Sequence, residues 1–269
     1  MKTKISISID AALNKNLNSL IDGLNIRNKS QAIEYLIKKS MDVKKTAVIL
    51  CGGESLKTET GVYRICAPFL KTTVIEYNLK ILRKNGFAKI HVAGNKQVLI
   101  EVFKIIGNGE LYGVSVEYLE DDIVPKGSMN TLSHVKNITQ TFLVASGDII
   151  LGETNVLSVW NAHILNKCVA TLHIQATIND VEKRGVVTLE GNLIKAYVEK
   201  PINKRSLINY SGFFVAEPEF FNQIGLSFEF DIFPRLAKNG LLCGHPTSEE
   251  IHHFHSQKEL NKIEKILNK

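Results

Sequence analysis

The sequence predicts an α/β protein, in which a mostly parallel mixed sheet is preceded by a small domain of one strand and two helices. From Thr46 onward, apolar runs of strand length alternate with segments of helical period, which is typical of sheets covered by helices on both faces. Residues 1–42 follow a different pattern and carry most of the net charge. We therefore expect two domains, 1–42 and 46–269, and 269 residues suffice for both.

The positive charge is concentrated at one end of the chain. Residues 1–45 hold nine Lys and Arg against four Asp and Glu, a net of +5 out of +6 for the whole chain. Such an excess suits contact with a polyanion, although a solvated lysine-rich tail gives the same count.

The first domain is expected to begin with an amphipathic strand. Ile5, Ile7 and Ile9 alternate with polar residues, Asp10 is placed to cap a helix through about Leu24, and residues 28–31 have capping-box spacing for a second helix. The predicted buried faces of the two helices consist of Leu13, Leu17, Leu20, Ile21 and Leu24, and of Ala32, Ile33, Leu36 and Ile37.

Such a strand has no partner within its own forty residues, and an unpaired half-apolar strand is unstable in water. Residues 1–42 resemble the ribbon-helix-helix (Arc/MetJ/CopG-like) transcription factors. The resemblance implies a homodimer whose paired strands enter the major groove of a double-stranded DNA operator. The implied DNA-binding residues are Lys2, Lys4, Ser6, Ser8, Arg27, Lys29 and Ser30. The alternative is a strand that only dimerises the protein.

The larger domain is expected to place its site where parallel strands end. Predicted strands cover residues 47–50, 89–93, 115–119 and 141–145, and a helix covers 73–85. The first strand runs into Gly52 and Gly53, and the last into Asp148. In sheets of this class ligands bind beyond the carboxyl ends of the strands.

Several segments, in order, resemble the sugar-1-phosphate nucleotidyltransferases, over roughly residues 46–260. The matching segments are Leu50–Gly53, the run from Pro68 to Tyr77, Pro125–Gly127, Leu143–Asp148, Tyr197–Pro201 and Asn209–Phe214. The resemblance implies a Rossmann-like, GT-A-type nucleotidyltransferase fold.

The resemblance also implies a reaction in which a sugar phosphate attacks the α-phosphorus of a nucleoside triphosphate and expels pyrophosphate. Catalysis of this kind is mainly positioning and charge stabilisation. The implied catalytic residues are Lys57, Arg64 and Asp148, with Asp148 as ligand of Mg²⁺. The implied nucleotide-binding residues are Leu50, Gly52, Gly53, Gly127 and Ser128, and the sugar-phosphate residues are Glu199, Lys200, Asn209 and Gly212.

The signature loop departs from the family pattern. Ser55 stands where the family has a third glycine, Lys57 replaces its arginine, Arg64 falls where its lysine is expected, and Glu54 adds a negative charge. Arginine and lysine differ in geometry, so these exchanges weaken the case for turnover.

The family's second metal carboxylate is expected near residue 253, where this chain has His252, His253 and His255. No cysteine or carboxylate at ligand spacing completes a metal site there, although Glu249 and Glu250 are near. Ordinary strand histidines are therefore the favoured interpretation, with a dedicated metal site as the alternative.

The remaining composition suggests a cytoplasmic protein. The cysteines at 51, 66, 168 and 243 are scattered without a C-x-x-C motif, which favours free thiols in a reducing compartment. The N-terminus has no apolar signal region, and no apolar run approaches the length of a bilayer span, so we expect no membrane contact.

Three functions are compatible with these patterns. The favoured one is a DNA-binding transcriptional regulator whose larger domain binds a nucleotide, sugar phosphate or nucleotide sugar as effector. The second is an active sugar-1-phosphate nucleotidyltransferase that regulates its own gene. In the third, the N-terminal arm only assembles the enzyme.

Overall fold

The computed structural model describes residues 6–23, 26–41, 45–52, 57–122, 126–176, 184–201, 207–247 and 250–267. The chain divides into two compact units, residues 1–44 and residues 45–269. Among the described residues, no helix combines the length and apolarity needed to cross a bilayer.

The smaller unit contains the two expected helices, α1 (Ala11–Ser19) and α2 (Lys29–Met41). The predicted caps are confirmed: Asp10 accepts the N–H of Leu13 at 2.8 Å, and the Asn28 side chain accepts the N–H of Gln31 at 3.0 Å. The predicted end of α1 near Leu24 is wrong. Hydrogen bonds between Asp22 and Ile26 close a turn there, which is incompatible with continued helix.

The predicted apolar stripes of this unit are only partly buried. Leu17 and Ala32 are buried, whereas Leu13, Leu36 and Ile37 keep 54%, 40% and 44% of their surface exposed. Two short helices have little besides each other to pack against within the unit. Residues 6–10 form no strand ladder with any described segment, and the ribbon therefore stays a prediction.

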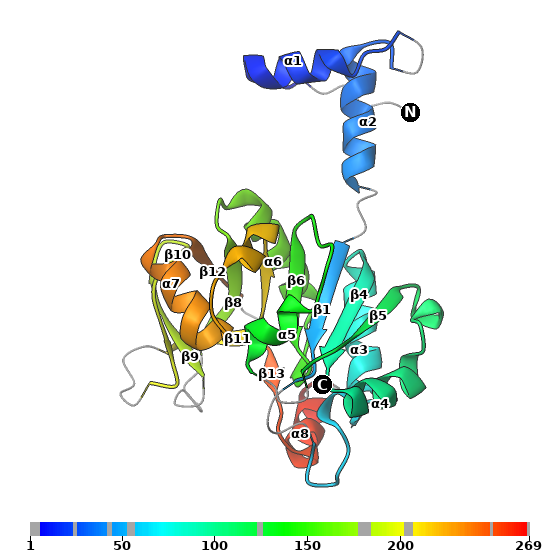
Figure 1. Cartoon of the computed structure of the whole chain (residues 1–269), viewed down its shortest axis with the longest axis vertical. Coiled ribbons are helices and arrows are strands. Elements are labelled where there is room, and N and C mark those ends of the chain that lie inside the picture. The colour runs from blue at the N-terminus through cyan, green and yellow to red at the C-terminus, as the bar shows by residue number, and fades with distance from the viewer. Residues whose placement is uncertain are drawn as a thin grey trace. The chain divides into compact units, whose positions relative to one another are not determined.

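The larger unit is built on a nine-stranded sheet (Figure 1). Its strands are β1 (Lys45–Leu50), β4 (Phe87–Gly94), β5 (Ser115–Glu120), β6 (Phe142–Ser146), β8 (Ala170–Ala176), β9 (Gly185–Glu190), β10 (Leu193–Glu199), β11 (Ile208–Ala216) and β12 (Leu242–Pro246). Two further ladders pair β2 (Pro68–Phe69) with β3 (Thr72–Thr73), and β7 (Ile149–Ile150) with β13 (His252–His253).

The strand order is β5-β4-β1-β6-β11-β8-β12-β10-β9. The first four strands are mutually parallel, as the alternation of strands and helices predicts. The expectation of a mostly parallel sheet is wrong for the other half, where β11 runs antiparallel to β6 and β8, and β9 and β10 form a hairpin. A short turn can join only antiparallel neighbours, and β9 and β10 are joined by just such a turn.

Helices cover both faces of the sheet. The helices of the larger unit are α3 (Val74–Lys84), α4 (Lys96–Ile106), α5 (Ser128–Ser133), α6 (Glu153–Leu165), α7 (Phe233–Lys238) and α8 (Gln257–Leu267), with short 3-10 turns at Arg64–Cys66, Glu110–Tyr112 and Pro218–Asn222 and a π turn at Phe228–Ile232. Residues of α3, α4 and α6 join one core cluster, and residues of α5 and α7 join another. The larger unit is therefore a three-layer α/β/α structure.

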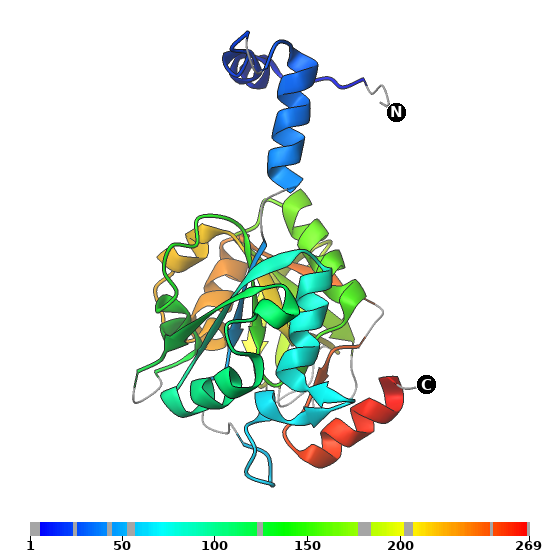
Figure 2. The same cartoon turned by 90° about the vertical axis from the view of Figure 1, so that its right-hand side faces the viewer.

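The last helix closes a third, smaller core. Leu260 and Ile263 of α8 pack with Phe254 against Phe69 and Val74. Figure 2 shows α8, in red, beside the cyan β2–β3 hairpin. This cluster attaches the C-terminal helix at the end of the sheet to which β1 points (Figure 1).

Two cysteines expected to be free form a disulfide. Cys168 and Cys243 are bonded with 5.9 Å between their Cα atoms, whereas Cys51 and Cys66 are free and buried. The parallel pairing of β12 with β8 brings the two residues together across 75 positions of sequence. Spacing alone could not reveal that contact.

Candidate functional site

A pocket of about 990 Å³ opens at the carboxyl ends of β1 and β6. This is the position that the strand pattern predicts for a ligand site. Of the predicted site residues, Leu50, Gly52, Gly127, Ser128, Glu199 and Gly212 line it. The lining also includes Lys126, Thr131, Arg184, Glu229, His253, His255, Glu259 and Lys262.

The wall at Gly127 and Ser128 is fixed by a neighbouring loop. Gly127 has φ +135°, and a Cβ atom there would lie 2.4 Å from the carbonyl oxygen of Leu226, so only glycine fits. Ser128 donates a hydrogen bond to Glu229 at 2.9 Å and accepts the N–H of Phe228 at 2.9 Å. The loop therefore presents a rigid backbone to the pocket.

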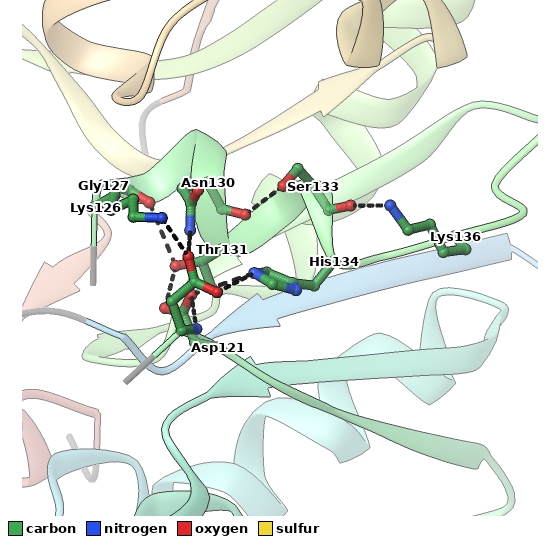
Figure 3. Close-up of polar contacts among 9 residues, drawn as sticks. Asp121, Lys126, Gly127, Asn130, Thr131, Ser133, His134 and Lys136 are labelled. Carbon is green, nitrogen blue, oxygen red and sulfur yellow. Dashed lines mark hydrogen bonds and ion pairs between the residues drawn. The ribbon is translucent and has the colours of Figure 1, made fainter. Parts of the chain in front are cut away.

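A buried carboxylate supports the same wall from behind. Thr131, which lines the pocket, donates a hydrogen bond from its hydroxyl to Asp121, whose side chain is fully buried (Figure 3). His134 approaches the same carboxylate at 3.7 Å, while Asn130 and Lys126 bond to the adjacent Asp122 at 3.2 and 3.0 Å. A Cβ on Gly52 would lie 3.3 Å from Asp121, so the glycine lets β1 end directly above this network.

Asp148 lies beyond the end of β6 and is already engaged. Arg64 contacts one of its carboxylate oxygens at 3.2 Å, and Ser146 donates to the other at 2.7 Å. Gly147 allows this turn to approach β1 closely, since a Cβ there would lie 3.1 Å from the Leu50 carbonyl oxygen, to which its N–H donates at 2.8 Å. Two residues predicted to be catalytic, Arg64 and Asp148, are thus brought together across 84 positions of sequence.

The histidine segment packs against this carboxylate. β13 pairs with β7, and Phe254 donates its N–H to the Asp148 carbonyl at 3.2 Å. The Nδ1 atoms of His253 and His255 each lie 3.9 Å from an oxygen of the Asp148 side chain. Burial lowers the pKa of His253, against an opposing effect of Asp148.

The segment Tyr197–Pro201, which contains two of the predicted sugar-phosphate residues, places the Glu199 side chain in the pocket. Glu199 accepts a hydrogen bond from Tyr197 at 2.8 Å, and burial raises its pKa. Gly185 is required opposite, because a Cβ there would collide with the Tyr197 hydroxyl. Lys200 is exposed and does not line the pocket, and Asn209 is buried with its amide donating to the Leu207 carbonyl at 2.7 Å.

Three cations line the pocket together with the predicted residues: Lys126, Arg184 and Lys262. Lys126 lies within the matching segment Pro125–Gly127, whereas Arg184 and Lys262 lie in segments without a motif. The Nη1 atom of Arg184 is buried and has no hydrogen-bond partner among the described residues. A guanidinium of this kind is suited to a phosphate group, because a phosphate oxygen can accept a hydrogen bond from this N–H.

Lys57 lies in a different place from the other predicted catalytic residues. Its ammonium stands 4.7 Å from the ring centroid of Tyr63, and both line a separate pocket of about 480 Å³ with Gln97 and Glu101. Gly53, Glu54 and Ser55, and with them most of the signature loop, fall outside the described residues. The catalytic role of Lys57 stays a prediction.

The DNA-contacting surface also stays a prediction. Ser6, Ser8, Arg27, Lys29 and Ser30 are all exposed in the smaller unit. Lys2 and Lys4 lie outside the described residues.

Comparison with known proteins identifies the larger unit. The family model described as nucleotidyl transferase matches residues 46–235. The chain belongs to the nucleotidyl transferase family. Part of it is similar to a UTP–glucose-1-phosphate uridylyltransferase of Synechocystis sp., with 27% identity over 219 residues. That match covers 72% of this chain and 56% of the relative, so the nucleotidyl transferase described here spans little more than half of its length.

Solved structures agree on the fold. A putative glucose-1-phosphate thymidylyltransferase from Bacillus anthracis, in complex with a sucrose, superimposes with a TM-score of 0.74 at 19% identity, over 82% of this chain and 94% of that one. The inositol-1-phosphate CTP transferase from T. maritima gives a TM-score of 0.70 at 17% identity, over 83% and 95%. The predicted nucleotidyltransferase fold is confirmed, and the family match begins at residue 46, after the N-terminal unit.

The donor set around Asp148 only partly fits the Mg²⁺ expected for this family. Mg²⁺ prefers oxygen ligands in octahedral geometry, commonly one or two carboxylates with substrate phosphates and waters. Asp148 supplies one carboxylate, but imidazoles stand where the resemblance implies the second. Among the described residues, no three potential ligands are arranged as a formed metal site.

Proposed function

We propose that this nucleotidyl transferase joins a nucleoside triphosphate to a sugar 1-phosphate and releases pyrophosphate. The carrying observation is the family match over residues 46–235 together with a pocket at the ends of β1 and β6. The comparisons support this function better than they support a DNA-binding regulator.

In the proposed reaction, an oxygen of the sugar phosphate attacks the α-phosphorus of the nucleoside triphosphate. The bond from that phosphorus to the oxygen bridging it to the β-phosphate breaks, and pyrophosphate leaves with the electron pair. Negative charge is carried by the non-bridging oxygens, so the enzyme's main task is alignment and charge stabilisation.

The residues of the pocket divide naturally between these tasks. Gly52 and Gly127 line the pocket, and we assign their backbone to the nucleotide, beside the wall that Thr131 and Asp121 support. Arg184, Lys126 and Lys262 supply positive charge for phosphates. Glu199 lines the pocket, and we assign its carboxylate to accept hydrogen bonds from the sugar hydroxyls.

The proposal is tested by measuring pyrophosphate release from a matrix of nucleoside triphosphates and sugar 1-phosphates, with divalent cations present. Release should require both substrates. Arg184→Gln should lower kcat/KM by about 10²-fold or more, as expected for one charge-stabilising donor. Arg83→Gln, at an exposed position outside the lining of this pocket, is the matched comparison and should leave kcat/KM unchanged. Nucleotide binding without pyrophosphate release from any pair would favour the effector-binding regulator instead.

A second function is proposed for the N-terminal unit. Residues 1–44 carry eight Lys and Arg against four Asp and Glu, a net charge of +4, and apolar side chains predicted to be buried stay exposed in the isolated chain. Both observations favour a dimeric DNA-binding module. Because DNA binding would accompany catalysis and not replace it, the two functions are tested separately.

A further inference from the structure

We propose that the pocket selects a nucleobase with an exocyclic amino group over uracil and thymine, through the hydroxyl oxygens of Ser128 and Thr131. The inference rests on the proposed function, because it takes the ligand to be a nucleoside triphosphate. It adds the kind of base, and binding measurements alone can decide it.

The Thr131 hydroxyl can only accept a hydrogen bond from a ligand. Its proton goes to the carboxylate of Asp121, and the alternative acceptor, the Gly127 carbonyl at 3.3 Å, also belongs to the protein (Figure 3). An ionised carboxylate and a carbonyl have no proton to donate in return. The N–H of Asp122 donates to Asp121 at 2.9 Å, and the Asp121 side chain is fully buried, so this polarity is fixed. Thr131 therefore presents a lone pair to the pocket.

The Ser128 hydroxyl has the same polarity. It donates to Glu229 at 2.9 Å and accepts the N–H of Phe228 at 2.9 Å. Ser227 donates to the same oxygen of Glu229 at 2.7 Å, which holds that carboxylate in place. A hydroxyl oxygen has two lone pairs, so one is left for a ligand. Ser128 and Thr131 are three positions apart on α5, and this face of the helix thus offers acceptors to the pocket.

A ligand can reach the Thr131 hydroxyl because residue 52 is glycine. Gly52 and Thr131 both line the pocket, and a Cβ on Gly52 would lie 3.4 Å from the Thr131 hydroxyl oxygen. A side chain at this position would cover that oxygen. Its absence leaves the acceptor open at the end of β1.

Acceptors of this kind favour the base over the phosphates at this wall. Phosphate oxygens are themselves acceptors, and Arg184 and Lys262 line the same pocket with the donors that phosphates need. Lys126 also lines the pocket, but its ammonium is paired with Asp122 at 3.0 Å. The base therefore lies at Ser128 and Thr131.

The edge of the base decides which nucleotide binds. Cytosine, adenine and guanine each carry an exocyclic amino group, whereas uracil and thymine have a carbonyl oxygen where cytosine has its amino group. An amino group offers N–H donors to the acceptors of this wall. A carbonyl would face them as a further acceptor, and such a pairing is repulsive. Exchanging a hydrogen bond for this contact should cost about tenfold or more in affinity.

The test measures the binding of CTP, ATP, GTP, UTP and inorganic triphosphate to the full chain by isothermal titration calorimetry in a buffer with Mg²⁺. The best of the amino-base nucleotides should bind more tightly than UTP by about tenfold or more. CTP and UTP are the matched pair, because they share ribose, phosphates and ring size. Inorganic triphosphate reports on the phosphate contacts alone.

Variants of α5 localise the preference. Thr131→Val should reduce it by about fivefold or more without changing the affinity for inorganic triphosphate, and Thr131→Ser should keep it. Ser133→Ala is the matched control, because this exposed residue of the same helix donates its hydroxyl to the Asn130 carbonyl. Its affinities should equal those of the unchanged chain.

Asp121 is expected to act as a positioning residue through Thr131. In Asp121→Asn the amide can donate to the Thr131 oxygen and free the hydroxyl proton for the base, so the preference should shift toward UTP. Combining Asp121→Asn with Thr131→Val should lose no more preference than Thr131→Val alone. The double variant also removes the buried unpaired carboxylate that could unfold Thr131→Val.

Two results would overturn the proposal. One is UTP binding as tight as that of the best amino-base nucleotide. The other is an equal loss of nucleotide and inorganic triphosphate binding in Thr131→Val, which would indicate general damage to the pocket. Efficient pyrophosphate release from UTP would refute the base preference and leave the proposed function standing. Selective binding of an amino-base nucleotide without pyrophosphate release from any sugar 1-phosphate would support the preference and refute the proposed function.

Discussion

At the scale of single residues, Gly212 shows how strongly the histidine segment constrains the pocket. Its φ is +95°, and an added Cβ would meet the His253 ring and Ile149 at under 3 Å. Gly212→Ala should therefore cost about 1–3 kcal/mol of unfolding free energy, through crowding and backbone strain. Urea unfolding measures the loss. Gly191→Ala, at φ +61° with open space around it, is the control for strain alone and should cost less.

A second residue-scale prediction concerns acid stability. Burial, with a smaller effect of His245, lowers the pKa of His173 to about 3, and the ring is bonded to Thr247 at 2.7 Å and stacked on Phe213. Its folded pKa lies below its unfolded value near 6.5, so the unfolded chain binds the extra proton. The stability contribution is complete above pH 6.5 and is lost as the pH falls toward 3.

His173→Gln should remove about one proton from the difference in proton binding between the unfolded and the folded chain. Between pH 6 and pH 4 the unfolding free energy of the variant should fall less steeply, by about 1.4 kcal/mol per pH unit. Its stability at pH 7 is expected to be lower, because the buried hydrogen bonds change. Chemical unfolding at several pH values gives both slopes. Equal slopes in the two proteins would show that His173 does not carry the effect.

At the scale of secondary-structure elements, α8 is attached to the larger unit through a small apolar core. Leu260 is fully buried against Phe69, Val74 and Phe254, while the same helix brings Lys262 to the pocket. Leu260→Ala should cost about 2–5 kcal/mol and loosen the helix. Nucleotide affinity should then fall as well. Leu267→Ala, 45% exposed on the same helix, should change neither stability nor affinity.

Local signals predicted the elements of the larger unit well. The helix expected over residues 73–85 is α3, where the side chains of Thr73 and Glu76 form a capping box, and the strand expected at 47–50 is β1. These signals depend on neighbours within a few residues. The site at Asp148 was predicted by resemblance, because its motif is also local.

What the sequence could not reveal are contacts between distant segments. Arg184 reaches the pocket from a stretch without a motif, and Cys168 meets Cys243 only because β12 pairs with β8. The sequence does not place the histidines near residue 253 beside Asp148, because that nearness arises from the β7–β13 pairing. No local pattern encodes such pairings, which depend on the assembled sheet.

At the scale of the whole molecule, the N-terminal unit presents apolar side chains that no described residue of the same chain covers completely. Leu13 is predicted to be buried, yet 54% of its surface is exposed within the chain. If a second copy covers it, Leu13→Glu should place a charge in the dimer interface and dissociate the dimer without unfolding the chain. Analytical ultracentrifugation measures the mass. Asn16→Glu, at an exposed position of the same helix, is the control and should remain dimeric.

DNA binding should be lost together with the dimer. A ribbon in the major groove needs strands from two chains, and phosphate contacts by lysines make the affinity fall steeply with salt concentration. We therefore expect Leu13→Glu to abolish salt-sensitive DNA binding while pyrophosphate release persists, because the pocket lies wholly within residues 45–269. Electrophoretic mobility shifts at several salt concentrations test the first expectation, and measurement of pyrophosphate release tests the second. A dimer that persists in Leu13→Glu would show that the arm does not pair through this face.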